Sequence, residues 1–143
     1  MMRILFVMIL LLKGGFVLQA QSAGDSVLDA SNKKIPVKQV GVASYYHSKF
    51  QGRKTASGEK YDAKKMTAAH NRVPIGTWIK VVNLMNKRSV IVRVNDRMHR
   101  KNHRLVDLSR AAASKLGYIG RGLTKVSVEI LPKGPEQNNS IKE

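Results

Sequence analysis

Three side chains in this sequence have the chemistry to donate, accept or orient a proton: Glu59, His70 and Asp96. Asp96 follows a valine-rich stretch directly and is flanked by Asn95 and Arg97. A carboxylic acid is the common donor of the proton that a leaving glycosidic oxygen needs, and ordinary glycosidases add a second carboxylate as base or nucleophile. Asp96 and Glu59 are therefore candidates for carbohydrate chemistry, and His70 is a candidate for orienting one of them. Their spacing alone does not bring the three together.

Two other interpretations of this region are open at the level of sequence. Asn and Asp are ordinary turn residues, because their side chains bond the local backbone, so Asn95 and Asp96 also fit a simple turn. His99 and His103 are four residues apart between Asp96 and Asp107, which resembles a set of metal ligands. The two histidines lie in a loop full of Arg and Lys, whose charge repels a cation. We therefore expect no metal and no other cofactor.

The overall charge indicates an anionic partner. The 143 residues include 26 Lys and Arg against 9 Asp and Glu, a formal net charge of +17. Nucleic acid, anionic lipid and acidic polysaccharide all fit such a surplus. The sequence has no RRM motif, zinc finger or helix-turn-helix, and its amino terminus resembles an export signal. Nucleic acid is therefore not expected as the partner. The absence of cysteine excludes disulfides and thiolate chemistry.

Alternating β-branched residues predict that most of the chain folds as short strands. One short helix is expected after Ser109, which is a favourable N-cap, with Gly117 as its end. A long polar connection, residues 47–62, separates the first strand from the second. This pattern is typical of an all-β protein with a small closed or nearly closed barrel. The predicted strands are residues 40–46, 66–70, 78–84, 89–94, 105–108 and 126–130.

The ends of the chain have a different composition from the middle. Residues 1–23 combine Arg3, a short apolar run and small residues at Ala20 and Ala23, which predicts a signal peptide. An amino-terminal membrane anchor is the alternative, but the apolar run is short for a span. Residues 24–38 are polar and are expected to be a flexible linker, and residues 132–143 a disordered tail. The predicted folded domain is residues 39–131.

Six short motifs then resemble one known family in combination. They are Gly-x-Ala-Ser-x-Tyr at 41–46, Gly-Arg-x-Thr-Ala-x-Gly-Glu at 52–59, Thr-Ala-Ala-His at 67–70, Pro-x-Gly-Thr at 74–77, Val-Asn-Asp-Arg at 94–97 and Asp-Leu-Ser-x-Ala-Ala-Ala at 107–113. The chain resembles the rare lipoprotein A family of septal lytic transglycosylases over nearly the whole predicted domain. A chance match to all six motifs in order is very improbable.

The resemblance implies a six-stranded double-psi β-barrel with one or two short helices and a cleft. It also implies cleavage of the bond between N-acetylmuramic acid and N-acetylglucosamine in peptide-poor peptidoglycan, with formation of a 1,6-anhydro sugar. The family's key positions fall on Asp96, Glu59 and His70, which would be catalytic here. Residues of the matched motifs are expected to bind the glycan: Tyr45, Tyr46, Arg53, Thr55, Asn95 and Arg97.

Departures from the family pattern keep an alternative open. Met98 and His99 replace the Gly-Pro that commonly follows Asn-Asp-Arg, so a non-catalytic, expansin-like glycan-binding module is the second hypothesis. There is no lipoprotein cysteine and no peptidoglycan-binding domain after the barrel, so neither lipid anchoring nor septal targeting is expected. The expectation is a periplasmic or secreted monomer without a stable membrane span, whose partner is the peptidoglycan glycan strand.

Overall fold

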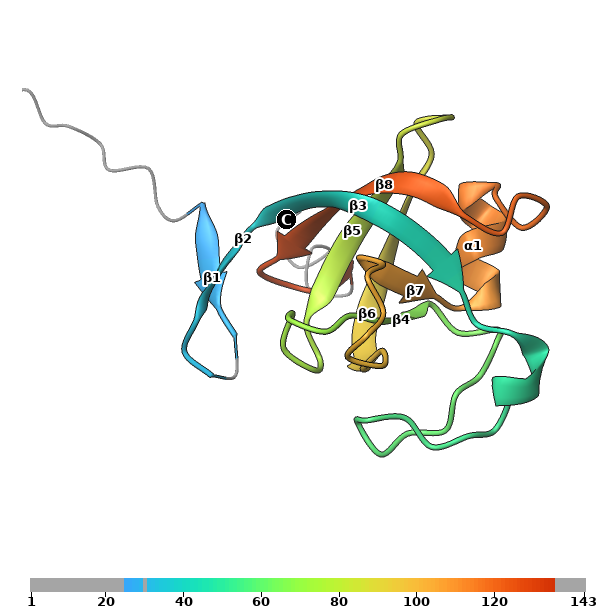
Figure 1. The fold of residues 1–143 in the computed structure, drawn as a ribbon, viewed down its shortest axis with the longest axis horizontal. Helices are drawn as coiled ribbons and strands as arrows, with labels where there is room; N and C mark the ends of the chain where they lie inside the picture. Colours follow the sequence, from blue (N-terminus) through green and yellow to red (C-terminus); the bar gives the residue numbers. More distant parts are fainter. Residues whose placement is uncertain (1–24, 30, 136–143) are drawn as a thin grey trace, which may run out of the picture.

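The computed structural model describes residues 25–29 and 31–135, and most of these form a closed barrel. Six strands close in the order β3-β7-β4-β6-β5-β8 (Figure 1). Two pairs, β3 with β7 and β4 with β6, are parallel, and the other four contacts are antiparallel. This mixed six-stranded arrangement confirms the expected double-psi β-barrel. The strands are β3 (Lys38–Tyr45), β4 (Thr67–Ala69), β5 (Trp78–Asn83), β6 (Ser89–Asp96), β7 (Val106–Leu108) and β8 (Thr124–Leu131).

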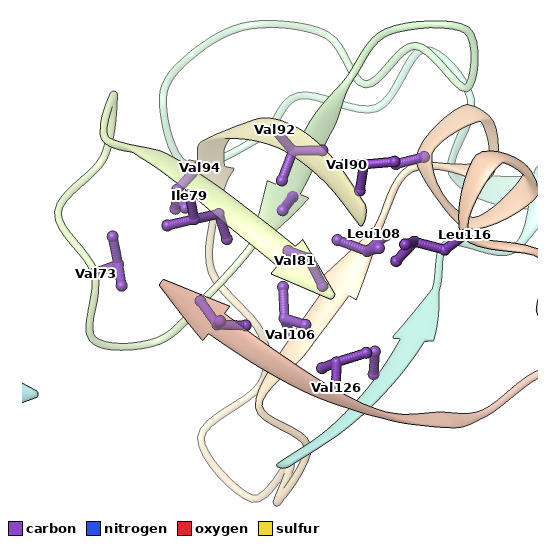
Figure 2. Packing of buried hydrophobic residues seen from close by; sticks show 14 of the residues in the cluster. Val73, Ile79, Val81, Val90, Val92, Val94, Val106, Leu108, Leu116 and Val126 are labelled. Atoms are coloured by element: carbon purple, nitrogen blue, oxygen red, sulfur yellow. The ribbon is translucent and has the colours of Figure 1, made fainter. Parts of the chain in front are cut away.

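The barrel interior is filled by the alternating apolar residues that the sequence pattern marked. In β6, Val90, Val92 and Val94 are buried while the residues between them are partly exposed. Figure 2 shows these valines packed with side chains from β5, β7 and β8. Inward-facing residues of a small barrel pack against one another and leave no channel. The core therefore holds the six strands at fixed positions around the site.

Helix α1 (Arg110–Leu116) begins and ends where the sequence predicted. The Ser109 side chain accepts a hydrogen bond from the Ala112 amide, and Gly117 takes the left-handed conformation with φ 77°. Glycine adopts that conformation without a steric penalty, which explains why the helix ends there. The buried Leu116 packs α1 onto the barrel core.

Part of the predicted linker, residues 24–38, forms regular secondary structure. Strands β1 (Ser26–Leu28) and β2 (Lys34–Pro36) form an antiparallel hairpin, drawn in blue beside the barrel in Figure 1. Val27 lies opposite Ile35, and Ile35 is fully buried within the main core cluster. Two apolar residues facing each other across a hairpin were too weak a local pattern to predict it.

The chain beyond β8 also differs in part from the expected tail. Gly134 is buried, and a Cβ atom added to it would clash with the Trp78 ring. The glycine therefore permits close packing of residues 132–135 against β5. The predicted signal peptide, residues 1–23, and the remainder of the predicted tail, residues 136–143, lie outside the described residues.

One irregularity places two aspartates at the same end of the barrel. The pairing of β4 with β6 shifts register between Ala68 and Ala69, which brings Asp96 level with Ala69. On its other side Ala69 is level with Asp107 of β7. Bulges of this kind re-aim side chains and are frequent beside active sites. Asp96 and Asp107 thus lie on either side of one short strand.

Candidate active-site cleft

A cleft of about 580 Å³ opens over this end of the barrel. Its lining comes from the end of β3, from the long connection between β3 and β4, and from the segment that joins β6 to β7. The connection between β3 and β4 includes the short 3-10 helix η1 (Ser48–Phe50) and extends away from the barrel at the lower right of Figure 1. The rigid strands thus supply two aspartates, and the two connections supply the walls.

Asp96 lies in this cleft and is held by three hydrogen bonds. The Tyr46 hydroxyl donates to Oδ2 at 2.6 Å. The backbone amides of Ala56 and Arg97 donate to Oδ1 at 2.9 and 2.8 Å. All three donors are neutral groups, and they come from three different segments of the chain. The carboxylate is therefore fixed in orientation while it remains partly exposed to the cleft.

Aromatic rings form the wall beside Asp96. Tyr46 stacks on Tyr61 with centroids 4.3 Å apart and meets Phe50 edge-on at 5.7 Å. Burial, with the hydrogen bond to Asp96, raises the pKa of Tyr46 well above its usual range, so its hydroxyl remains a proton donor in the hydrogen bond. Lys49 and Arg53 lie over the Phe50 ring, each 5.4 Å from its centroid. The wall thus offers apolar faces with cations at its edge.

The second aspartate of the cleft has a different kind of partner. Arg104 donates from Nε to Oδ1 of Asp107 at 2.7 Å and from Nη2 to Oδ2 at 2.8 Å. Both carboxylate oxygens are therefore occupied by one guanidinium group. A bidentate pair of this kind has a more specific geometry than a pair joined by a single hydrogen bond. Asp107 and Arg104 both line the cleft.

The backbone of His70 lies beside that of Asp96, but His70 does not line the cleft. Its side chain is buried, and Nδ1 accepts the backbone amides of Arg72 and Val73 at 3.0 and 3.1 Å. Burial, with the nearby charges of Arg97 and Arg72, lowers the pKa of His70 to about 4, so the ring is neutral at pH 7. Nδ1 is an acceptor, so Nε2 carries the proton, and Nε2 is buried with no partner among the described residues.

The backbone of His70 connects this turn to the cleft. Its amide donates to the Asp96 carbonyl at 3.1 Å, and its carbonyl accepts Arg97 Nη1 at 2.6 Å. Arg97 Nη1 also donates to the Val73 carbonyl at 2.8 Å. The histidine ring therefore shapes a turn whose backbone holds both Asp96 and Arg97 in place.

Glu59 also lies outside the cleft lining. Arg93 Nη2 is 2.7 Å from both carboxylate oxygens. That hydrogen bond lowers the pKa of Glu59, with smaller contributions from Asn95 and Ser57. The side chain is 38% exposed. Its backbone carbonyl accepts the Thr55 amide at 2.7 Å, so Glu59 closes the loop that carries Ala56 to Asp96.

Comparison of the sequence with known proteins identifies the family of this chain. A family model described as "Lytic transglycolase" matches residues 38–128. The chain belongs to the lytic transglycolase family. One curated relative is endolytic peptidoglycan transglycosylase RlpA of Haemophilus influenzae, which is 55% identical over 91 residues. The alignment covers 64% of this chain and 32% of that protein. RlpA of Neisseria meningitidis is 45% identical over 103 residues, covering 72% and 43%. The chain thus spans less than half the length of each.

Solved structures are similar at the level of the barrel. A Streptomyces papain inhibitor matches with a TM-score of 0.53 and 26% identity, covering 66% of this chain and 94% of that one. A mutant Clavibacter michiganensis expansin in complex with cellohexaose matches with a TM-score of 0.54 and 26% identity, covering 68% and 53%. Barrels of this form thus occur in proteins with different functions.

Most residues expected from the lytic transglycolase resemblance do meet in the cleft. Its lining includes Asp96 and the expected glycan contacts Tyr45, Tyr46, Arg53, Thr55 and Arg97. Glu59, His70 and the buried Asn95 are not part of that lining. Met98 and His99, which replace the usual Gly-Pro, do line it, and the Met98 amide is held by Asn71 Oδ1 at 2.7 Å.

The sequence reasoning missed several residues that line the cleft, and four of them supply its second carboxylate, the partner of that carboxylate and two aromatic rings. These four are Asp107, Arg104, Tyr61 and Phe50. Asp107 had a usable signal, because it lies in a short apolar strand within a matched motif, much as Asp96 does. The other three gave no local signal.

The described residues also contain no metal-ligand cluster and no helix of membrane-spanning length. No three His, Asp or Glu side chains of residues 25–29 and 31–135 converge as metal ligands. Over the same ranges no helix is long and apolar enough to cross a bilayer.

Proposed function

We propose that this chain is a lytic transglycosylase that cleaves the bond between N-acetylmuramic acid and N-acetylglucosamine in peptide-poor peptidoglycan. The observation that supports this most is the Asp96 carboxylate, oriented by three neutral donors in an open cleft beside stacked aromatic rings. Apolar ring faces with a few convergent polar groups are typical of ligand sites. Membership of the lytic transglycolase family supports the reaction class.

In the proposed reaction Asp96 acts first as acid and then as base. It protonates the glycosidic oxygen, the bond from C1 of the muramic residue to that oxygen breaks, and the C6 hydroxyl of the same sugar bonds to C1. The hydroxyl proton passes to the Asp96 carboxylate, which restores the starting state. Because the nucleophile is already part of the substrate, no activated water is needed, and intramolecular attack has a large entropic advantage.

The state of the second carboxylate supports this reaction over hydrolysis. An ordinary glycosidase needs a second carboxylate that is free to activate water or to attack the sugar. In the cleft that carboxylate is Asp107, and both of its oxygens are bound to Arg104. A single acid/base residue is compatible with an intramolecular nucleophile, whereas hydrolysis would need Asp107 to be released.

The other two residues expected to be catalytic have supporting positions in this proposal. Glu59 and His70 stabilise the two turns that hold Asp96, through Ala56 and through the His70 backbone. The expected signal peptide and the peptidoglycan substrate support a periplasmic or secreted location. The proposal keeps the expected monomer, acting on glycan strands. An expansin-like binder is the second candidate, favoured by the structural similarity to an expansin in complex with cellohexaose.

The test is mass spectrometry of the soluble products from peptide-stripped peptidoglycan. We expect anhydro-ended fragments from the wild type, none from Asp96→Asn, and wild-type yields from Glu129→Gln, an exposed carboxylate on the barrel exterior. Fragments with reducing ends would indicate a hydrolase. Binding without any product from the wild type would support the expansin-like binder.

A further inference from the structure

Arg104 differs from the other guanidinium groups of the cleft because a bidentate ion pair holds it while one of its edges stays free. Asp107 occupies its Nε and Nη2 positions at 2.7 and 2.8 Å. A guanidinium group has five N–H donors. Among the described residues no further hydrogen bond from this side chain is made, so the edge formed by Nη1 and the second Nη2 hydrogen is available. The side chain is 38% exposed and lines the cleft.

The other arginines near Asp96 are engaged differently. Arg97 uses Nη1 on the carbonyl oxygens of His70 and Val73. Arg53 lies over the Phe50 ring. Neither holds an ion pair that would fix its orientation. Only Arg104, of these three, combines a bidentate partner with an unused guanidinium edge on a residue that lines the cleft.

An oriented guanidinium edge is a recognition site for a carboxylate. The planar fork of Arg matches the two oxygens of a carboxylate, and prior orientation reduces the entropy lost on binding. Asp107 also stands two strands away from Asp96, across Ala69, which is about 10 Å at the usual strand spacing. A carboxylate on Arg104 would thus belong to a different part of an extended ligand from the bond beside Asp96.

We propose that Arg104, held by Asp107, binds the free lactyl carboxylate of a muramic acid residue and so selects peptide-free glycan strands. This inference rests on the proposed function for the identity of the polymer. In a peptide-bearing strand the lactyl group is an uncharged amide, and in a polymer of N-acetylglucosamine or glucose the group is missing. Such ligands offer Arg104 no carboxylate at the lactyl position, close to the sugar ring, which gives a physical reason for selecting stripped strands.

The test compares peptide-free peptidoglycan strands with the same strands after chemical reduction of their carboxyl groups to alcohols. Binding of the full chain to soluble fragments of each is measured by calorimetry. The wild type should bind the reduced strands about tenfold more weakly, the loss expected for one hydrogen-bonded charge pair. Arg104→Gln should bind unreduced strands about tenfold more weakly than the wild type and should bind reduced strands as the wild type does.

Two further variants separate the oriented fork from general positive charge. Arg100→Gln removes a charge from the same loop at an exposed position outside the cleft lining and should keep the wild-type preference. Arg104→Lys keeps the charge but loses the fork, and should lose most of the preference. Equal binding of reduced strands by the wild type and Arg104→Gln also shows that this variant is folded.

Three results would overturn the proposal. The wild type could bind unreduced and reduced strands equally, Arg104→Gln could keep the wild-type preference for unreduced strands, or Arg100→Gln could lose that preference as fully as Arg104→Gln does. A variant that loses binding to reduced strands as well would also count against it, because Arg104 would then support the cleft in general. Turnover distinguishes this inference from the proposed function. If the wild type prefers unreduced strands but releases no anhydro products, the proposed activity is refuted and the proposed carboxylate site is supported. If it releases anhydro products but shows no preference, the carboxylate site is refuted and the activity is supported.

Discussion

Asp96 and Asp107 make an instructive comparison, because the same residue type stands at matching positions on either side of Ala69. Asp96 receives hydrogen bonds from one hydroxyl and two backbone amides. Asp107 receives both of its hydrogen bonds from one guanidinium group. The donors to Asp96 orient its carboxylate in the open cleft, whereas the bidentate pair occupies both oxygens of Asp107 and fixes the guanidinium group of Arg104. In the proposed reaction, Asp96 therefore transfers the proton, and Asp107 orients Arg104.

The largest expected effect tests this division directly. Asp96→Asn should lower kcat by about 10²- to 10⁴-fold, the usual contribution of a general acid or base. Asp107→Asn should leave kcat nearly unchanged and raise KM by about tenfold or less, since Arg104 loses its fixed orientation. Release of anhydro products from stripped strands measures both. Equal losses of kcat in the two variants would contradict the comparison and indicate a two-carboxylate mechanism.

The second prediction concerns the turn beneath Asp96. The oxygen of an Asn side chain can replace His70 Nδ1 as acceptor for the Arg72 and Val73 amides, whereas Gln places its polar atoms nearer Nε2. His70→Asn should keep activity within a few fold. His70→Gln should lose on the order of 10²-fold, the cost of a small misplacement of a catalytic group. The opposite ranking would show that Nε2, buried and unpartnered among the described residues, is the working atom.

A smaller effect is expected from the hydroxyl that contacts Asp96. Tyr46→Phe keeps the ring stacked on Tyr61 and removes the donor at 2.6 Å. We expect kcat to fall about tenfold, in line with one hydrogen bond to a charged group, with KM little changed. Tyr45→Phe is the matched control, because its hydroxyl donates to the Ile119 carbonyl. If both variants behave alike, Tyr46 acts only through packing.

The last prediction concerns stability and not turnover. His70 has a pKa of about 4 in the folded chain and about 6.5 when unfolded, so the unfolded state binds more protons between these values. Its contribution to the free energy of unfolding is fully present above pH 6.5 and falls by on the order of 3 kcal/mol as the pH drops to 4. Urea unfolding at several pH values measures this. His70→Asn should flatten that slope between pH 6.5 and 4.5, and an unchanged slope would mean that His70 is not buried as a neutral ring.

Local pattern was sufficient for much of the barrel. The valines of β6 alternate, so the strand followed from the sequence, although it ends at Asp96, two residues later than predicted. Ser109 and Gly117 marked α1 because capping depends on a few adjacent residues. The β1–β2 hairpin was missed because its stability comes from burying Ile35 against residues distant in the chain. Periodicity cannot report such contacts.

The site divides in the same way. The sequence by itself determined which residue types are present that could carry chemistry, and its motifs singled out Asp96, Tyr46 and Arg97, which line the cleft. Only the tertiary structure decided that His70 supports a turn, that Glu59 pairs with Arg93, and that Asp107 orients Arg104 toward the cleft. Residue type fixes what a group can do, but its neighbours fix its charge, orientation and access. Those neighbours come from strands that pair across the barrel, far apart in the chain.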